Sequence, residues 1–380
     1  MLSRKTLFIC GGHFSPAIAL TEELTGLKDL NIFYLGRKFA LEGEKTLSFE
    51  YRQISKLQTP FLEITSGRLQ RHLSFYTVFS LFKIPVGIIQ SIKYFNKYKP
   101  DLIMSFGGYV AFPVSFTARL LGVDVITHEQ TRVMGLANRI IARFAKLTCL
   151  TFAETRGVPR SSRIKLTGLP VRKSIFKFKN TRITEFGNRK LQLIYITCGS
   201  LGSRSVNLII QQIVPELLKK FRIFHICGES RNNSDYHRLS RLRSSLERKL
   251  KGNYFLVTSL DYQLAGEVLK NSFLVIARSG INTVAEIFIH RKKAILIPLP
   301  WAAYNEQLDN AEILKKTGLA KIINQEDLSG KNLLQSIDLL INEYQNNFRK
   351  SSLQDWQFQG SKKIADLILS EISYSGGRLN

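Results

Sequence analysis

Short β-rich runs alternate with helix-like segments along most of this 380-residue chain. In the first half the β-rich runs lie at 6–10, 31–35, 102–106, 123–127 and around 147–152. In the second half they lie at 192–197, 222–227, 254–257, 273–277 and 294–298. Segments with a 3.6-residue apolar period separate the runs, a pattern typical of βαβ units in an open parallel sheet. The chain is therefore expected to form two doubly wound α/β halves.

A basic segment without sustained periodicity lies between the two halves. It spans 167–190 and reads TGLPVRKSIFKFKNTRITEFGNRK, which suits a connection between domains. We expect an N-terminal domain over 1–172 and a C-terminal domain over 173–355. A final helix at about 356–373 is expected to pack back on the N-terminal domain. The chain is long enough for two cores of ordinary size.

The charge balance indicates an anionic partner. The chain carries 55 Lys and Arg against 29 Asp and Glu, a formal charge of +26. Such a surplus suits nucleic acid, acidic lipid headgroups or a phosphorylated substrate. The charge is dispersed, and no basic motif with interleaved aromatic residues is visible in the sequence, so no nucleic acid is expected. The cysteines lack CxxC spacing, which argues against structural zinc or a disulfide framework; they are Cys10, Cys149, Cys198 and Cys227.

One apolar segment approaches the length of a membrane span. Residues 73–92 read LSFYTVFSLFKIPVGIIQSI, but Lys83 and Pro85 interrupt the run. We expect a helix that lies on a membrane or faces a partner rather than one that crosses a bilayer. The N-terminal MLSRKTLFICGG has too short an apolar stretch for a secretory signal and is expected to form a strand and a turn.

Small and polar residues follow one expected strand after another. They occur at 11–13 (GGH), 107–109 (GGY), 128–130 (HEQ), 198–202 (CGSLG), 227–229 (CGE), 259–261 (SLD), 278–280 (RSG) and 298–311 (PLPWAAYNEQLDNA). In open α/β sheets ligands bind outside the carboxyl ends of the strands. The series therefore predicts a cleft between two facing sheets.

Two turns of the second half have features of phosphate sites. CGSLGSRSVN (198–207) leads from a strand into a helix, where backbone N–H groups and hydroxyls can bind an anion, although a structural turn is the alternative. It lacks the Lys-Ser/Thr of a P-loop. In ARSGINTVAEIF (277–288), Arg278 precedes the turn at Gly280. Glu286, further along the expected helix, could accept the hydroxyl hydrogens of a ribose or be a solvated carboxylate.

Two histidines of the first half follow strands. His13 lies on the turn before the helix opened by Pro16, where it is either incidental or moves a proton. His128 and Glu129 form a pair that lacks a further metal ligand at workable spacing. Polar positioning of a sugar or acceptor and a satisfied structural histidine are both open for His128.

The motifs, taken in order, resemble those of the MurG-type N-acetylglucosaminyltransferases of peptidoglycan synthesis. The resemblance extends from residue 7 to about 330 and rests on GGHFSPAIAL, GGYVAFPVSFTARLLGVDVITHEQ, GLANR, TGLPVR, GSLGSRSVN, ARSGINTVAEI and NEQLDNA. It implies a GT-B fold, with two Rossmann-like domains facing each other across a nucleotide-sugar cleft. It also implies inverting transfer of GlcNAc from UDP-GlcNAc to undecaprenyl-pyrophosphoryl-MurNAc-pentapeptide (lipid I to lipid II), without a metal or other cofactor.

The resemblance also implies roles for individual residues, with His13 as the general base. It assigns donor binding to Gly11, Gly12, Arg172, Ser200, Leu260, Arg278, Ser279, Gly280, Ile281, Asn282, Thr283, Glu286, Gln307 and Asn310. In that set Leu260 would contact the uracil and Glu286 the ribose, while Gln307 and Asn310 would hold the GlcNAc. It assigns the acceptor side to Tyr109, His128, Glu129 and Asn138.

The chain departs from the family pattern in its first turn. The family's loop is usually Gly-Gly-Thr-Gly-Gly-His, whereas here the strand leads directly into Cys10-Gly11-Gly12-His13. We therefore expect the diphosphate contacts to come from 199–203 and 278–283. The expected partners are UDP-GlcNAc, a polyprenyl-pyrophosphoryl sugar acceptor and an anionic membrane surface. The expected location is peripheral, on the cytoplasmic face of the cell membrane.

Other functions remain open at the level of sequence. A different inverting GT-B transferase would use a UDP-sugar with another lipid or glycan acceptor. A UDP-sugar 2-epimerase shares the two-domain fold but is disfavoured by the GGY and HEQ motifs and the apolar segment. A basic nucleic-acid-binding protein would account for the charge. An inactive membrane-bound scaffold would account for the shortened first turn.

Overall fold

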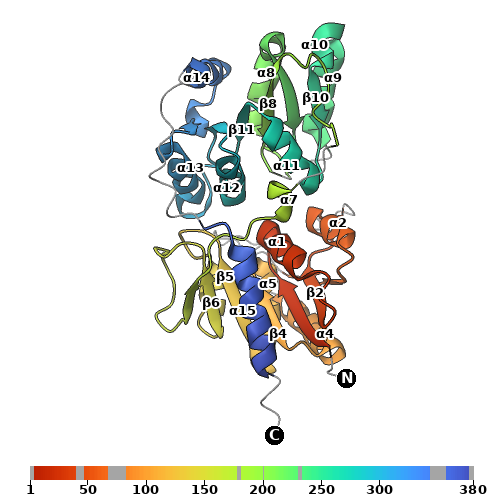
Figure 1. The fold of residues 1–380 in the computed structure, drawn as a ribbon, viewed down its shortest axis with the longest axis vertical. Coiled ribbons are helices and arrows are strands. Elements are labelled where there is room, and N and C mark those ends of the chain that lie inside the picture. The colour runs from red at the N-terminus through yellow and green to blue at the C-terminus, as the bar shows by residue number, and fades with distance from the viewer. Residues whose placement is uncertain are drawn as a thin grey trace. The chain divides into compact units, whose positions relative to one another are not determined.

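The computed structural model describes residues 4–39, 47–66, 83–177, 181–199, 201–229, 233–342 and 357–375. The chain divides into two compact units, Met1–Lys173 with Asp355–Asn380, and Ser174–Gln354. Each unit has one parallel sheet with helices packed around it (Figure 1). The two doubly wound α/β halves predicted by the alternation are confirmed.

The first unit has a seven-stranded sheet in the order β3-β2-β1-β4-β5-β6-β7. Its strands are β1 (Lys5–Cys10), β2 (Leu30–Gly36), β3 (Phe61–Glu63), β4 (Leu102–Ser105), β5 (Asp124–Glu129), β6 (Leu147–Leu150) and β7 (Ile164–Leu166). The central strand β1 pairs with β2 on one side and β4 on the other. Four consecutive residues of β1, Leu7 to Cys10, are fully buried, which explains the apolar run in the sequence.

Helices cover both faces of this sheet. They are α1 (Phe14–Leu24), α2 (Phe49–Lys56), α4 (Lys83–Tyr98), α5 (Gly108–Leu120), α6 (Leu136–Ile141) and the C-terminal α15 (Gly360–Ser375). Helix α15 packs beside α1, where the Ser361 hydroxyl donates to Glu23 at 3.3 Å. Its start is anchored by the Leu169 amide, which donates to the Gln357 carbonyl at 2.7 Å. The C-terminal helix therefore belongs to the first unit.

The second unit has a six-stranded sheet in the order β10-β9-β8-β11-β12-β13. Its strands are β8 (Gln192–Thr197), β9 (Phe221–Ile226), β10 (Tyr254–Val257), β11 (Leu274–Ala277), β12 (Lys293–Leu296) and β13 (Ala320–Ile322). Its helices are α8 (Arg204–Lys220), α9 (Ser234–Ser245), α10 (Arg248–Gly252), α11 (Tyr262–Asn271), α12 (Ile281–Ile289), α13 (Glu306–Lys316) and α14 (Gly330–Asn342). Short helical turns form η2 (Ala303–Asn305) and η3 (Gln325–Asp327), and α7 (Lys173–Phe176) leads into the unit.

Both sheets reverse their strand order beside the first strand of the unit, between β1 and β4 and between β8 and β11. Such a reversal opens a crevice at the carboxyl ends of the strands, where ligands bind in doubly wound folds. The edge strands β3, β7 and β13 have three residues each, too few to show a strand period in the sequence.

The apolar segment predicted to meet a membrane or a partner is only partly described. Residues 73–82 lie outside the described part of the chain, whereas 83–92 form the start of α4. Among the helices that the structure describes, none has the length and apolar character needed to span a bilayer.

A buried polar network joins β9 to the helices α8 and α9 of the second unit. The side-chain amide of Asn207 donates to the Cys227 carbonyl at 2.9 Å and to Asp235 at 2.8 Å. His225 lies 3.1 Å from the Asn207 carbonyl oxygen through Nε2 and 2.9 Å from the Tyr254 hydroxyl through Nδ1. Burial lowers the pKa of His225 to about 3, although Asp235 favours the charged form. The imidazole is therefore neutral, with Nε2–H donating to Asn207 and Nδ1 accepting from Tyr254.

We expect the free energy of unfolding of this unit to fall as the pH drops below about 6.5. In the unfolded chain His225 regains its ordinary pKa, so below that pH the unfolded state binds the additional proton and is favoured. His225→Gln should be less stable near pH 7 and should lose less stability between about pH 7 and pH 5 than the unmodified chain. Urea denaturation followed by circular dichroism at both pH values measures this difference. An identical loss in both proteins would contradict it.

Candidate functional site

The first unit brings two glycine turns into backbone contact at the carboxyl edge of its sheet. Gly11 and Gly12 follow β1, and Gly107 and Gly108 follow β4. The Gly12 amide donates to the Gly107 carbonyl at 2.8 Å. A Cβ on Gly108 would lie 3.0 Å from the Gly12 Cα, so a side chain there would force the two turns apart. Gly11 and Gly12, both predicted donor-site residues, thus form the packed turn that carries His13.

His13 is exposed at the N-cap of α1 and contacts the end of β5. Its Nδ1 lies 2.9 Å from Nε2 of Gln130, whose side chain belongs to a residue only 5% exposed. An amide nitrogen can only donate, so in this arrangement Nδ1 accepts and the proton is on Nε2. If the amide turns over, its oxygen accepts from Nδ1–H and Nε2 is left with a lone pair. Gln130 therefore selects which nitrogen of His13 can accept a proton.

Three of the predicted acceptor-side residues belong to a buried hydrogen-bond network beside this turn. Glu129 Oε1 accepts from the Thr131 amide at 3.1 Å and hydroxyl at 2.8 Å. Glu129 Oε2 accepts from the Gly135 amide at 3.0 Å and from Asn138 at 2.9 Å. Asn138 also donates to the His128 carbonyl at 3.0 Å. The network holds the loop between β5 and α6, and its members bond to protein groups.

His128 lies in the core at the end of β5, only 1% exposed. Its Nε2 is 3.2 Å from the Gly168 carbonyl oxygen, and its ring meets the ring of Phe106 edge-on. Burial lowers the pKa of His128 to about 4, so the imidazole is neutral and donates through Nε2. Its Nδ1 is buried and has no hydrogen-bond partner among the described residues, so the structural alternative that the sequence left open is met at Nε2 only. A contact of His128, Glu129 or Asn138 with an acceptor stays a prediction.

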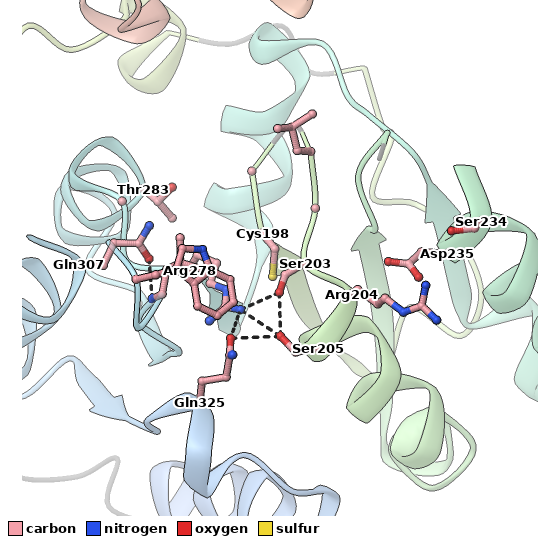
Figure 2. Close-up of a pocket in the computed structure, with 16 residues that line it drawn as sticks. Cys198, Ser203, Arg204, Ser205, Ser234, Asp235, Arg278, Thr283, Gln307 and Gln325 are labelled. Carbon is pink, nitrogen blue, oxygen red and sulfur yellow. Dashed lines mark hydrogen bonds between the residues drawn. The ribbon is translucent and has the colours of Figure 1, made fainter. Parts of the chain in front are cut away.

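The second unit contains a pocket of about 560 Å³ at the carboxyl edge of its sheet (Figure 2). Its wall comes from the turn between β8 and α8, the start of α12, the loop after β12, and η3. Of the residues predicted for donor binding, those in this wall are Arg278, Gly280, Thr283 and Gln307. Ser203, another wall residue, lies in the range 199–203 that was expected to contact a diphosphate. The sequence did not single out several further wall residues, among them Ser205, Asp235, Trp301 and Gln325.

The guanidinium of Arg278 hydrogen-bonds to several segments of the pocket wall, and the residue is only 8% exposed. Nη1 donates to the carbonyl oxygens of Ile297 and Pro298, each at 3.0 Å. Nη2 donates to Ser203 Oγ at 2.7 Å, to Ser205 Oγ at 3.1 Å and to Gln325 Oε1 at 2.6 Å (Figure 2). Burial lowers the pKa of Arg278 from its usual value, and the guanidinium still carries its charge at neutral pH. The pocket therefore has a fixed positive charge in its wall.

Two helix N-termini open at the same pocket. Helix α8 begins after Ser203, whose hydroxyl bonds Arg278 and makes no cap hydrogen bond to its own helix. Helix α12 begins after Gly280, which has no side chain to cap it. N–H groups at a helix start carry partial positive charge and bind anions. With Arg278 between them, the two helix starts make a site suited to a phosphate or diphosphate.

Gln307 in the pocket wall and Asn310 on the same helix, α13, each bond to a backbone group. Gln307 Oε1 accepts from the Leu299 amide at 3.0 Å, and Asn310 donates to the Ser279 carbonyl at 3.2 Å. The Ser279 hydroxyl is buried and has no hydrogen-bond partner among the described residues. Ile281 is buried, and Asn282 and Glu286 are half-buried on α12.

Three predicted donor residues lie elsewhere. Leu260 is half-buried just before α11. Arg172 lies in the first unit, at its boundary, and is buried. Ser200 lies outside the described residues. Within the parts of the chain that the structure describes, no group of three or more His, Cys, Asp or Glu residues could hold a metal ion.

The missed wall residues have weak sequence signals. Trp301, 70% exposed, is an isolated aromatic in the loop after β12. Gln325 is 47 residues from Arg278 in the chain, and nothing near it in the sequence points to a ligand.

Comparisons with known proteins agree over both units. Residues 10–149 match the glycosyltransferase family 28 N-terminal domain, and residues 193–368 match the C-terminal domain of the same family. A relative from Clostridium perfringens is 32% identical over 367 residues, 94% of each chain. A relative from Clostridium botulinum is 32% identical over 364 residues, 94% of this chain and 95% of its own. Both are named UDP-N-acetylglucosamine–N-acetylmuramyl-(pentapeptide) pyrophosphoryl-undecaprenol N-acetylglucosamine transferase.

Solved structures give the same result. MurG of Acinetobacter baumannii superposes with a TM-score of 0.65 at 25% identity, covering 96% of this chain and 99% of its own. UDP-GlcNAc 2-epimerase of Neisseria meningitidis has a TM-score of 0.62 at 14% identity, with 96% and 100% covered, and shows the fold alone. The GT-B fold and the family predicted from the motifs are confirmed. With both domains matched and MurG-type transferases among its relatives, the chain belongs to glycosyltransferase family 28.

Proposed function

We propose that this glycosyltransferase moves GlcNAc from UDP-GlcNAc, with inversion, to the muramyl sugar of undecaprenyl-pyrophosphoryl-MurNAc-pentapeptide. The observation that carries the proposal is the pocket in which the starts of α8 and α12 flank Arg278. The names of the relatives supply the sugar and the acceptor. The GT-B fold by itself does not decide between transferases and epimerases, so the argument rests on the site.

The donor half of the reaction needs a group that stabilises the departing diphosphate. The helix starts after Ser203 and Gly280 present N–H groups, and Arg278 adds a full positive charge. Protein acceptors hold Arg278 in place before any substrate arrives, so its charge is preorganised. Preorganised charge stabilises the negative charge that develops on the leaving diphosphate in the transition state. In this proposal Thr283 adds a hydroxyl donor and Glu286 holds the ribose.

The remaining donor contacts follow the predicted roles. Gln307 and Asn310 hold the GlcNAc, Leu260 contacts the uracil, and Arg172 and Ser200 contribute to donor binding. Gln307 and Asn310 already bond the loop after β12 and the Ser279 backbone. Their side chains are therefore fixed in position, which favours a specific sugar contact over a loose one.

The acceptor half of the reaction needs a base for the incoming hydroxyl, and we assign this role to His13. His13 is exposed just after β1, and imidazole is the side chain most often used as a general base. To act as the base, Nε2 must have its lone pair free, which requires the Gln130 amide oxygen to face Nδ1–H. Gln130 is thus a positioning residue for the base.

Conversion of a lipid-linked muramyl acceptor to its GlcNAc-bearing product, with radiolabelled UDP-GlcNAc as donor, tests the proposal. His13→Gln should lower kcat by about 10²–10⁴ because the hydroxyl loses its base. The Michaelis constant for UDP-GlcNAc should stay unchanged. Transfer to a different lipid acceptor alone would overturn the acceptor assignment, and formation of UDP-ManNAc without transfer would favour an epimerase.

Substitutions of Gln130 test the proton position on His13. A Gln130→Glu carboxylate can only accept, so it should fix the proton on Nδ1 and move the acid limb of the kcat/KM profile to higher pH. Gln130→Leu removes the hydrogen bond and should lower kcat by about tenfold or more, as expected for a misplaced tautomer. The ¹⁵N shifts of the His13 ring report the tautomer directly. Unchanged shifts and an unchanged pH profile in both variants would contradict the role.

We also propose that the enzyme docks on the cytoplasmic face of the cell membrane through α4. Val86, Ile89 and Ile92 form one exposed apolar face of that helix, and Ile89 is 67% exposed. Lys93 and Lys97 are exposed on the following turns, where they can meet anionic headgroups.

Ile89→Ser should weaken binding to vesicles that contain phosphatidylglycerol by several-fold, because it removes apolar area from the docked face. Sedimentation with vesicles of graded phosphatidylglycerol content measures this. Leu339→Ser is the matched control, since Leu339 is an exposed apolar residue on α14 of the other unit. Equal weakening by both variants would argue against a docking role for α4.

A further inference from the structure

The indole of Trp301 lies in the wall of the second unit's pocket with most of its surface open to solvent. Trp301 follows β12 and is 70% exposed, the largest exposed fraction among the large apolar side chains that the structure describes. An indole is a large apolar group, and leaving it in water forgoes the stabilisation that burial gives. The wall therefore offers an aromatic surface that a ligand can cover.

Hydrogen bonds from the pocket hold the loop that carries this indole. Nη1 of Arg278 donates to the Pro298 carbonyl at 3.0 Å. The Leu299 amide donates to Gln307 Oε1, also at 3.0 Å (Figure 2). Both anchoring side chains belong to the pocket wall, and Trp301 is only two residues beyond Leu299. The backbone that carries the indole is thus fixed relative to the charged part of the wall.

The same loop orients the side-chain amide of Gln307. A backbone amide can only donate, so the oxygen of Gln307 faces Leu299. Its Nε2 group has no hydrogen-bond acceptor among the described residues and keeps its two hydrogens for a ligand. A ligand that covers the indole therefore also meets a hydrogen-bond donor that is held in position.

The pocket wall combines two kinds of lining. Arg278 and the starts of α8 and α12 supply positive charge, whereas Leu201, Leu299 and Trp301 supply apolar surface. A ligand that suits both has an anionic group joined to a ring with an apolar face. A pyranose attached to a diphosphate has this form, because its C–H groups make up the faces of the ring while its hydroxyl and acetamido groups project from the rim.

A nucleobase also stacks on aromatic rings, so the neighbours of Trp301 decide between the sugar and the base. The polar neighbour on this loop is Gln307, whose free Nε2 suits the hydroxyl and acetamido oxygens of a sugar. Leu260, the residue proposed for the uracil, lies elsewhere, just before α11. The arrangement favours the sugar as the ring that meets the indole.

We propose that Trp301 is a stacking platform for the sugar ring of the donor, with Gln307 Nε2 donating to a group on the rim of that ring. The identity of the sugar as GlcNAc rests on the proposed function, whereas stacking of a diphosphate-linked pyranose rests on the pocket. Trp301 then sets how tightly the sugar part of the donor is held and adds little to binding of the nucleotide part.

The first test compares UDP-GlcNAc with UDP by calorimetry on the full chain. Trp301→Ala should weaken binding of UDP-GlcNAc by about tenfold, as expected for a lost aromatic contact, and leave that of UDP unchanged. Trp301→Phe keeps a smaller ring and should lose less. Phe176→Ala is the matched control, since Phe176 is an exposed aromatic of the same unit outside the pocket wall, and it should change neither affinity.

Two outcomes of this comparison overturn the platform. Equal weakening of UDP and UDP-GlcNAc by Trp301→Ala would assign the indole to the nucleotide. Unchanged affinity for both would leave the indole without a ligand contact. Because the side chain is mostly exposed, the variants should fold normally, and circular dichroism of each variant checks this.

A fluorescence titration reports the contact directly. The chain has two tryptophans, Trp301 and Trp356, so Trp356→Phe leaves Trp301 as the single indole emitter. Saturating UDP-GlcNAc should shift its emission to shorter wavelength because the sugar ring covers the indole, whereas UDP should leave the emission maximum in place. An unchanged maximum with saturating UDP-GlcNAc would contradict the platform.

The transfer assay separates this inference from the proposed function. Trp301→Ala should raise the Michaelis constant for UDP-GlcNAc by about tenfold and leave that for the acceptor unchanged. If the unmodified chain transfers nothing to the muramyl acceptor, yet Trp301→Ala still weakens binding of UDP-GlcNAc and not of UDP, the proposed function fails and the platform stands. Absence of UDP-GlcNAc binding by the unmodified chain would overturn both.

Discussion

The hydrogen bonds of one buried guanidinium hold the second unit's pocket in shape. A cation removed from water needs acceptors, and the two Nη atoms of Arg278 bond to acceptors that lie between 19 and 75 residues away in the chain. Those acceptors come from the loop after β12, the start of α8 and η3. A lysine offers a single ammonium instead of a planar fork and could not join them in the same way. The two helix starts face one pocket because Arg278 bonds to the segments around them.

In the first unit, contact between two backbone turns holds the edge of the sheet in shape. Two glycine turns meet where a side chain would not fit, and this contact places His13 at the edge of the sheet. Beside it, Glu129 and Asn138 are fully occupied in holding the loop after β5, which leaves Gln130 as the residue of that motif that reaches His13. Burial keeps the imidazole of His128 neutral, whereas His13 is exposed.

Much of the fold could be predicted from the sequence. Parallel strands are buried on both faces, so they appear in the sequence as apolar runs between amphipathic helices. This alternation predicted both sheets. The turns after β1, β4, β8 and β11 were found because glycine and small polar residues are needed where chains approach closely at strand ends. Of the pocket residues, Arg278, Gly280, Thr283 and Gln307 were within reach for this reason. The edge strands β3, β7 and β13 were missed, because three residues show no period.

The sequence by itself determined the doubly wound class, the two halves, the family motifs and the strand ends at which ligands would bind. Only the tertiary structure decided which polar residues serve the fold and which border a site. Glu129 and Asn138 read as ligand contacts in the sequence, yet their bonds go to protein groups. Gln325 and Gln130 gained their places through partners distant in the chain. Local patterns report burial and backbone geometry, whereas hydrogen-bond partners and burial of single side chains depend on segments that meet only when the chain folds.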